Sequence, residues 1–259
     1  MIFTKNKTQP ITIFAETDIG KERSTNEDSV ASLVINAHSF KKDLNCGILV
    51  VADGMGGHEL GEVASHLASK KFIEETVQSI YLSAENNNEI NFKNVLIKSI
   101  ESANNEVWKI SEKHSNRIGT TLVGAIIHGN QVYIANVGDS RAYLVKPQKS
   151  ILQITKDHTV VQEMVDANII TKEQAKIHPR RNMLTKALGL SEDVIPDIFE
   201  IEIEDKTLLL CSDGLYGMVD DDEIKETING NIYKTVEELI TLANKHGGQD
   251  NISIALARK

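Results

Sequence analysis

The chain has 259 residues, of which 41% are hydrophobic and 25% are charged. This balance excludes a wholly disordered chain, and a chain of this length buries enough surface to fold without a disulfide or a structural metal. The formal net charge of −9 argues against a general binder of nucleic acid or anionic membranes, because such binding needs a basic face.

The sequence also lacks the marks of a membrane or secreted protein. The longest unbroken apolar stretch, residues 48–52, is far shorter than the ~20 residues of a membrane helix, and residues 1–10 contain no apolar signal-peptide core. Cys46 and Cys211 each stand beside an apolar run, which favours buried, reduced thiols. We therefore expect a cytoplasmic protein.

In the first half of the chain, strand patterns precede two long amphipathic segments. Alternation over residues 11–19 and β-branched side chains over residues 29–35 predict strands, and residues 47–52 predict a buried strand that ends at Asp53. Apolar residues at helical spacing predict two helices, the first containing Val63, Leu67, Phe72, Val77 and Ile80 and the second Val95, Ile100, Ala103, Val107 and Ile110. The three asparagines at 86–88 are the expected loop between them.

The second half returns to strands. The Gly129-Asn130 pair separates two strand patterns and predicts a hairpin. The expected strands cover residues 120–127, 131–137, 142–145, 151–154, 198–203, 207–211 and 252–257, and the expected helices lie near 222–228 and 236–246. Hairpins and paired helices without regular βαβ alternation indicate an α+β fold with a largely antiparallel sheet. One domain is expected, because the strands near both ends need partners in the middle.

Acidic residues stand at the ends of the predicted strands. They are Glu27 and Asp28 between the first two strands, and Asp53, Asp139, Asp213 and Asp250, each with glycine beside or near it. One aspartate alone is more readily a turn former than a ligand, but small neighbours let a backbone approach a ligand closely. If these carboxylates converge, their repulsion requires cations or raised pKa values. An all-oxygen set without Cys or His favours Mg²⁺ or Mn²⁺, with Ca²⁺ as the alternative.

A phosphate partner is indicated by Arg23, four residues before Glu27, because a guanidinium binds a pair of phosphate oxygens. Arg23 alone is more readily a surface residue than a phosphate-binding one. The glycine cluster of residues 53–58 lacks the third glycine of a dinucleotide fingerprint and the Lys-Ser/Thr of a Walker loop, and no Gly-x-Ser-x-Gly elbow occurs. Nucleotide binding and serine-hydrolase chemistry are therefore poorly supported.

Five short motifs follow one another in a specific order. They are Arg23 with Asn26-Glu27-Asp28, residues 51–58 (VADGMGGH), Gly138-Asp139-Ser140-Arg141, Ser212-Asp213-Gly214 and Gln249-Asp250-Asn251. In this order they resemble the metal-dependent Ser/Thr protein phosphatases of type 2C, over residues 12–258. Residues 155–163 and 178–189 resemble the flap of the bacterial branch of that family.

The resemblance implies an α+β fold in which an antiparallel β-sandwich is flanked by helix pairs. It implies a single domain of residues 11–259, after an N-terminal extension of residues 1–10, with a flap subdomain at about 156–190. A metal centre of two ions, or three, would be either Mg²⁺ or Mn²⁺. Its implied ligands are Glu27, Asp53, the Gly54 carbonyl, Asp139, Asp213 and Asp250. Asp53 would bridge two ions, and Asp139 would join Asp213 at a third.

Three catalytic residues are implied in the same way. Arg23 would bind the phosphate, and Asp28 would orient a nucleophilic water that bridges two ions. Met55 replaces a histidine that animal members carry as a proposed general acid, which leaves His58 as the nearest candidate. A metal-bound water is the other candidate for that acid, and bacterial relatives share the methionine.

The implied function is hydrolysis of phosphoserine and phosphothreonine in proteins, opposing bacterial Ser/Thr kinases. The expected partners are phosphorylated proteins and their kinase, with no nucleic acid or membrane, and the expected state is a monomer. Three alternatives stay open: an inactive phosphoprotein-binding regulatory module, a hydrolase of small phosphate esters, and a switch phosphatase for one regulatory partner.

Overall fold

The structure is a computed structural model that describes residues 10–38, 43–56, 59–85, 89–113 and 118–259. The expected asparagine loop at 86–88 and the candidate acid His58 lie outside the described residues. Both sheets are antiparallel throughout the described part of the chain, as the hairpin signals predicted.

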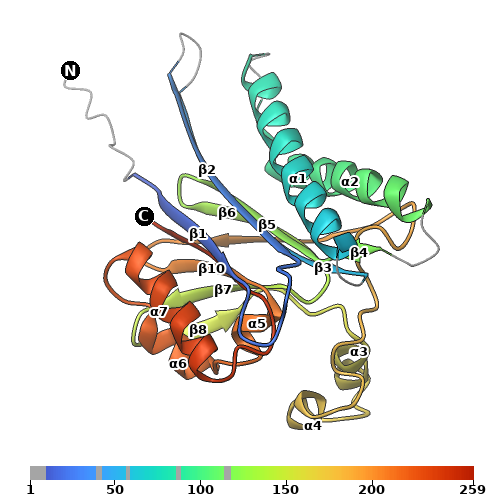
Figure 1. Cartoon of the computed structure of the whole chain (residues 1–259). Helices are drawn as coiled ribbons and strands as arrows, with labels where there is room; N and C mark the ends of the chain where they lie inside the picture. Colours follow the sequence, from blue (N-terminus) through green and yellow to red (C-terminus); the bar gives the residue numbers. More distant parts are fainter. Residues whose placement is uncertain (1–9, 39–42, 57–58, 86–88, 114–117) are drawn as a thin grey trace.

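Two sheets face each other as a sandwich (Figure 1). The five-stranded sheet has the order β1-β11-β10-β7-β8, from strands β1 (Thr12–Asp18), β11 (Ile252–Arg258), β10 (Thr207–Cys211), β7 (Arg141–Lys146) and β8 (Ser150–Gln153). The six-stranded sheet has the path β2-β3-β5-β6-β9, from β2 (Asp28–His38), β3 (Asp43–Met55), β5 (Leu122–His128), β6 (Gln131–Val137) and β9 (Asp197–Glu202), and the short β4 (Gly119–Thr120) pairs with β3.

Helices cover both outer faces of the sandwich (Figure 1). Helices α1 (Glu59–Glu85) and α2 (Phe92–Ser111) lie on the six-stranded sheet. On the other side lie α5 (Asp213–Tyr216), α6 (Asp221–Thr227) and α7 (Ile232–Lys245), while α3 (Val160–Asp166) and α4 (Lys172–Lys176) project from one end. This confirms the predicted α+β sandwich.

Strand β3 shows why its sequence is continuously apolar. Leu49 and Val51 pack between the sheets, whereas Ile48 and Val50 pack against the helices, and all four are fully buried. A strand buried on both faces needs apolar residues at every position. Gly124 on β5 has no Cβ, so the ring of Phe72 from α1 packs directly on the strand.

The C-terminal helices differ from the prediction at two points. Helix α7 begins at Ile232, four residues before the predicted start, because the Asn231 side chain accepts hydrogen bonds from the backbone N–H groups of Tyr233 and Lys234 and so caps the helix. Helix α5 was not predicted, because a helix of four residues is too short to show a helical period.

The structure describes the state of the two cysteines and the character of the helices. Cys46 and Cys211 are free and buried, as predicted, and burial raises the pKa of the Cys46 thiol to about 12. In the ranges that the structure describes, no helix combines the length and the apolar character needed to cross a bilayer.

Candidate metal centre and active site

A cavity of about 510 Å³ gathers most of the predicted site residues. Its wall includes Arg23, Glu27, Asp53, Gly54, Asp139, Asp213 and Asp250. These residues come from five separate parts of the chain, and the loops and strand ends at one end of the sandwich bring them together. Asp28 does not form part of this wall, and His58 lies outside the described residues.

Asp53 and Asp28 are neighbours in the sheet, because β2 and β3 pair with these two residues opposite each other. The backbone of Asp53 is fixed by Thr121, whose hydroxyl accepts from the Asp53 N–H at 3.0 Å and whose N–H donates to the Asp53 carbonyl at 2.8 Å. Asp28 is buried and accepts a hydrogen bond of 2.7 Å from the Ser212 hydroxyl. Asp28 is therefore placed next to the cavity by a second layer of polar residues.

Asp213 opens α5, with Ser212 as the single residue between it and the end of β10. Its Oδ1 atom is buried and has no hydrogen-bond partner among the described residues. Asp250 precedes β11, and its Oδ2 accepts from the Arg23 guanidinium at 2.7 Å. A buried carboxylate oxygen without a donor is unfavourable unless a cation or another ligand contacts it.

Asp139 lies on the loop from β6 to β7 and is buried. Gly138 before it has φ +107°, and a Cβ at that position would collide with Thr121, so glycine is required there. The Tyr216 hydroxyl of α5 donates to the Asp139 carbonyl at 3.0 Å. The Asp139 loop is thus held to the same short helix that carries Asp213.

Small residues allow the Glu27 loop to approach α1. The Gly54 N–H donates to the Glu27 carbonyl at 3.0 Å, and a Cβ on Gly54 would collide with the carbonyl of Gly61. A Cβ on Gly61 would in turn collide with the Glu27 carboxylate. The missing Cβ atoms of Gly54 and Gly61 therefore permit a close approach between the Glu27 loop and α1.

The clustered carboxyls have raised pKa values. Burial is the largest cause for each of them; it raises the pKa of Asp28 to about 8, that of Asp139 to about 8 and that of Asp213 to about 6. The pKa of Asp53 lies well above its ordinary value, through burial and then through the charges of the other aspartates. Arg141 partly opposes this effect at Asp139 and Asp213. A divalent cation would remove the need for protons on this cluster.

The residues fit hard divalent ions by chemistry. In the part of the chain that the structure describes, Asp and Glu side chains line the wall, no Cys or His belongs to it, and the Asp213 Oδ1 atom lacks a donor. Among the described residues, however, no three His, Cys, Asp or Glu side chains stand close enough together to form a preassembled cage. Ionised carboxylates repel one another, so a closer arrangement of these side chains would require a bound cation.

Sequence reasoning missed several residues of the wall and of the layer behind it. Asn182 and Leu184 line the cavity from the segment between β8 and β9. Asn251 holds the loop that carries Arg23 and Glu27, and Thr121 and Ser212 hold Asp53 and Asp28. Asn251 and Ser212 stand inside two of the five motifs, and Asn182 and Leu184 lie in the flap segment of residues 178–189, so a signal was present for these four residues. A motif does not say which backbone groups its amides and hydroxyls contact, and no motif marked Thr121.

Comparisons with known proteins agree with this arrangement. Residues 14–164 match the family described as Protein phosphatase 2C. The Serine/threonine phosphatase stp of Listeria monocytogenes serotype 4b is 40% identical over 250 residues, which cover 94% of both chains. The crystal structure of Ser/Thr phosphatase Stp1 from Staphylococcus aureus has a TM-score of 0.81 at 35% identity, covering 96% of this chain and 95% of that one.

A third similar protein is the catalytic domain of the Ser/Thr protein phosphatase PstP, whose structure was solved in complex with two manganese ions. It has a TM-score of 0.75 at 30% identity and covers 96% of this chain and 97% of that one. The five motifs, the sandwich fold with its cavity and these matches all indicate the same family, and the matches cover almost the whole chain. The chain belongs to the protein phosphatase 2C family and is a metal-dependent Ser/Thr phosphatase.

Proposed function

We propose that the protein releases phosphate from phosphoserine and phosphothreonine in protein substrates at the cavity of about 510 Å³, with two Mg²⁺ or Mn²⁺ ions, or three. The observation that carries the proposal is that four aspartates and Arg23 share the wall of one cavity. The proposed ion ligands are Glu27, Asp53, the Gly54 carbonyl, Asp139, Asp213 and Asp250. Two manganese ions in the related PstP domain support the ion type and number.

Bound ions would supply the Lewis acidity that lowers the pKa of water and offsets charge on the phosphate oxygens. The chain itself would provide orientation. Arg23 binds the phosphate oxygens, since its guanidinium is half exposed and reaches the cavity wall. Asp28, held by Ser212, orients the attacking water from its place behind Asp53. His58 is the proposed proton donor to the leaving hydroxyl.

The segment of residues 156–190 is proposed to act as the flap of a single domain of residues 11–259, following an extension of residues 1–10. Asn182 and Leu184 support this role, because both reach the cavity wall. We further propose that the protein acts as a cytoplasmic monomer and opposes a Ser/Thr kinase. Names of relatives such as the Listeria Serine/threonine phosphatase stp support the substrate class.

The experiment that tests this function is phosphate release from a phosphothreonine peptide in EDTA and then in Mg²⁺ or Mn²⁺. Release should appear only with an ion, should exceed the release from a matched phosphotyrosine peptide, and should fall by orders of magnitude in Asp53→Asn. An equal rate on free phosphoserine would favour a hydrolase of small phosphate esters. A folded protein that binds Mn²⁺ without releasing phosphate would favour the inactive regulatory module.

A further inference from the structure

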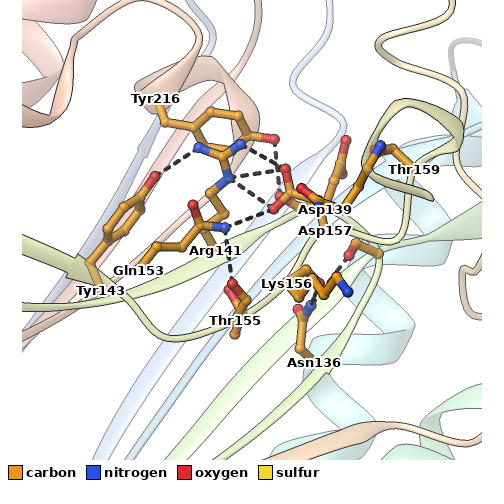
Figure 2. A network of polar contacts seen from close by, with 12 residues as sticks. Asn136, Asp139, Arg141, Tyr143, Gln153, Thr155, Lys156, Asp157, Thr159 and Tyr216 are labelled. Atoms are coloured by element: carbon orange, nitrogen blue, oxygen red, sulfur yellow. Dashed lines mark hydrogen bonds and ion pairs between the residues drawn. The ribbon is translucent and has the colours of Figure 1, made fainter. Parts of the chain in front are cut away.

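Arg141, the first residue of β7, connects several elements beside the cavity (Figure 2). Its Nε and Nη2 atoms donate to both carboxylate oxygens of Asp157 at 2.7–3.2 Å, and its Nη1 donates to the Tyr143 hydroxyl at 2.9 Å. Its guanidinium carbon lies 3.6 Å from the centre of the Tyr216 ring. One side chain therefore joins β7, α5 and the segment that leads into α3.

The contacts around Arg141 form a closed circuit that includes one proposed ion ligand, Asp139, and that is connected through α5 to a second, Asp213. Asp139 is two residues before Arg141 in the chain, and Asp213 is three residues before Tyr216 in α5. The Tyr216 hydroxyl donates to the Asp139 carbonyl at 3.0 Å. The stacking of Arg141 on Tyr216 and this hydrogen bond together fix the Asp139 loop against α5.

Burial and geometry make Arg141 a rigid part of this circuit. The side chains of Arg141 and Asp157 are only 22% and 10% exposed. Gln153 also donates to Asp157, at 3.1 Å, so the carboxylate cannot easily follow a displaced partner. A planar guanidinium can bind a carboxylate with two donors and stack on a ring at the same time, whereas an ammonium group cannot do both.

We propose that Arg141 is a positioning residue that sets the spacing between the Asp139 and Asp213 carboxylates. It acts through Tyr216 and through its own loop, with Asp157 as the fixed counter-ion. The proposal rests on the proposed function, and on the expectation from the family resemblance that Asp139 and Asp213 share the third ion. Arg141 is not part of the cavity wall, so its effect on that ion is indirect.

A matched pair of variants tests this role. Arg141→Lys keeps the positive charge but loses the two-donor contact and the stacking. The control is Arg258→Lys, at the opposite end of the same sheet. Arg258 lies opposite Thr207, the first residue of β10, whereas Arg141 lies opposite Cys211, the last residue of β10. The Arg258 guanidinium also makes hydrogen bonds, to the Thr207 hydroxyl and the Gly230 carbonyl. Both variants lose arginine geometry, but only one of them lies beside the proposed ion ligands.

The readout is Mn²⁺ binding to the substrate-free protein, followed by calorimetry, with the Mn²⁺ dependence of activity and the KM for phosphopeptide as companions. The third ion, shared by Asp139 and Asp213, is expected to bind more weakly than the other two. In Arg141→Lys we expect this weakest Mn²⁺ step to lose on the order of tenfold in affinity, the equivalent of a charge-assisted contact, with an unchanged KM at saturating Mn²⁺. Arg258→Lys should bind Mn²⁺ as the wild type does. Equal Mn²⁺ affinities in the two variants would overturn the proposal.

Tyr216→Phe provides a second test, which does not depend on the folding of Arg141→Lys. This variant keeps the ring under the guanidinium and removes only the hydroxyl that binds the Asp139 carbonyl. The same Mn²⁺ step should weaken on the order of fivefold, as expected for one hydrogen bond, and unchanged affinity would overturn the proposal. Wild-type protein that binds Mn²⁺ but releases no phosphate would contradict the proposed function alone, because Arg141 is tested by binding.

Discussion

At the scale of single residues, Arg23 and Asp250 hold each other in place. Their ion pair of 2.7 Å joins the proposed phosphate-binding group to a proposed ion ligand. The side chains are 52% and 32% exposed, and exposed pairs of this kind contribute about 1 kcal/mol or less. Breaking this ion pair therefore costs little free energy. A phosphate at Arg23 and a cation at Asp250 would each form a stronger contact than the ion pair they replace.

Replacing Arg23 should separate substrate binding from turnover. In Arg23→Ala the KM for a phosphothreonine peptide should rise on the order of tenfold, because a charge-assisted contact to the phosphate is lost, and kcat should change less. Arg23→Lys should recover part of the KM, since it restores charge without the two-donor fork. Steady-state kinetics at saturating Mn²⁺ provide the measurement. A loss confined to kcat would instead place the effect of Arg23 in the transition state.

At the scale of structural elements, one asparagine holds the loop between β1 and β2. The Asn251 Oδ1 accepts from the Glu27 N–H at 2.8 Å, and its Nδ2 donates to the carbonyls of Ile19 and Thr25 at 2.9 and 3.0 Å. Asn251 is buried, so these three bonds are shielded from water. The loop that carries Arg23 and Glu27 is thus fixed by Asn251, a residue of the motif that also contains Asp250.

Removing this amide should reduce activity as well as stability. Asn251→Ala leaves one N–H and two carbonyls without their partner, which should lower the free energy of unfolding by about 2–3 kcal/mol and lower kcat/KM on the order of tenfold. Asn104→Ala is the matched control, because Asn104 also makes three hydrogen bonds to backbone groups, at Gly189, Ser191 and Glu192.

Urea unfolding and peptide kinetics on both variants distinguish the two effects. The control should lose a similar free energy of unfolding while keeping its kcat/KM. Asn104 holds the loop that contains Ser191 and Glu192 against helix α2, and it does not hold the cavity wall. If Asn104→Ala lost as much kcat/KM as Asn251→Ala, the reduced activity would reflect stability in general and not the position of the β1–β2 loop.

The sequence predicted the elements that are marked by a local signal, such as a turn dipeptide or an apolar run. The Gly129-Asn130 hairpin joins β5 and β6 as expected, and the apolar run before Asp53 is a strand buried on both faces. The four residues of α5 and the start of α7 were not predicted, because the former depends on tertiary packing and the latter on a cap. For the site, the motifs indicated the acids of the wall. They could not show that Asp28 lies outside it, because that depends on where Ser212 comes to lie.

At the scale of the whole molecule, the sandwich concentrates negative charge at one end. Asp28 and Asp139 each have a pKa of about 8 because both are buried beside other carboxylates. In the unfolded chain these groups titrate near their ordinary value of about 4. Between the two values the folded state holds more protons than the unfolded state, so its stability without metal should fall as the pH rises.

Thermal unfolding in EDTA should reveal this dependence between pH 6.5 and 8. Each such carboxyl removes up to about 1.4 kcal/mol of stability per pH unit in this window. The window starts at pH 6.5 in order to exclude the titration of His158. Burial lowers the pKa of His158, so below about pH 6.5 this residue makes the stability rise with pH, which is the opposite of the effect of the carboxyls. Asp28→Asn should unfold with a shallower pH dependence, and saturating Mn²⁺ should remove most of the wild-type decline. A wild-type melting temperature that stayed constant or rose across this window in EDTA would contradict the raised pKa values.

The most direct test of the central claim is anomalous diffraction at the manganese edge from crystals of this protein grown with Mn²⁺. We expect at least two anomalous peaks inside the cavity, in contact with the carboxylates of Asp53, Asp213 and Asp250, and we expect these peaks to be lost in Asp53→Asn. Active protein whose Mn²⁺ peaks lie away from this cavity, or that shows no peak there, would contradict this claim.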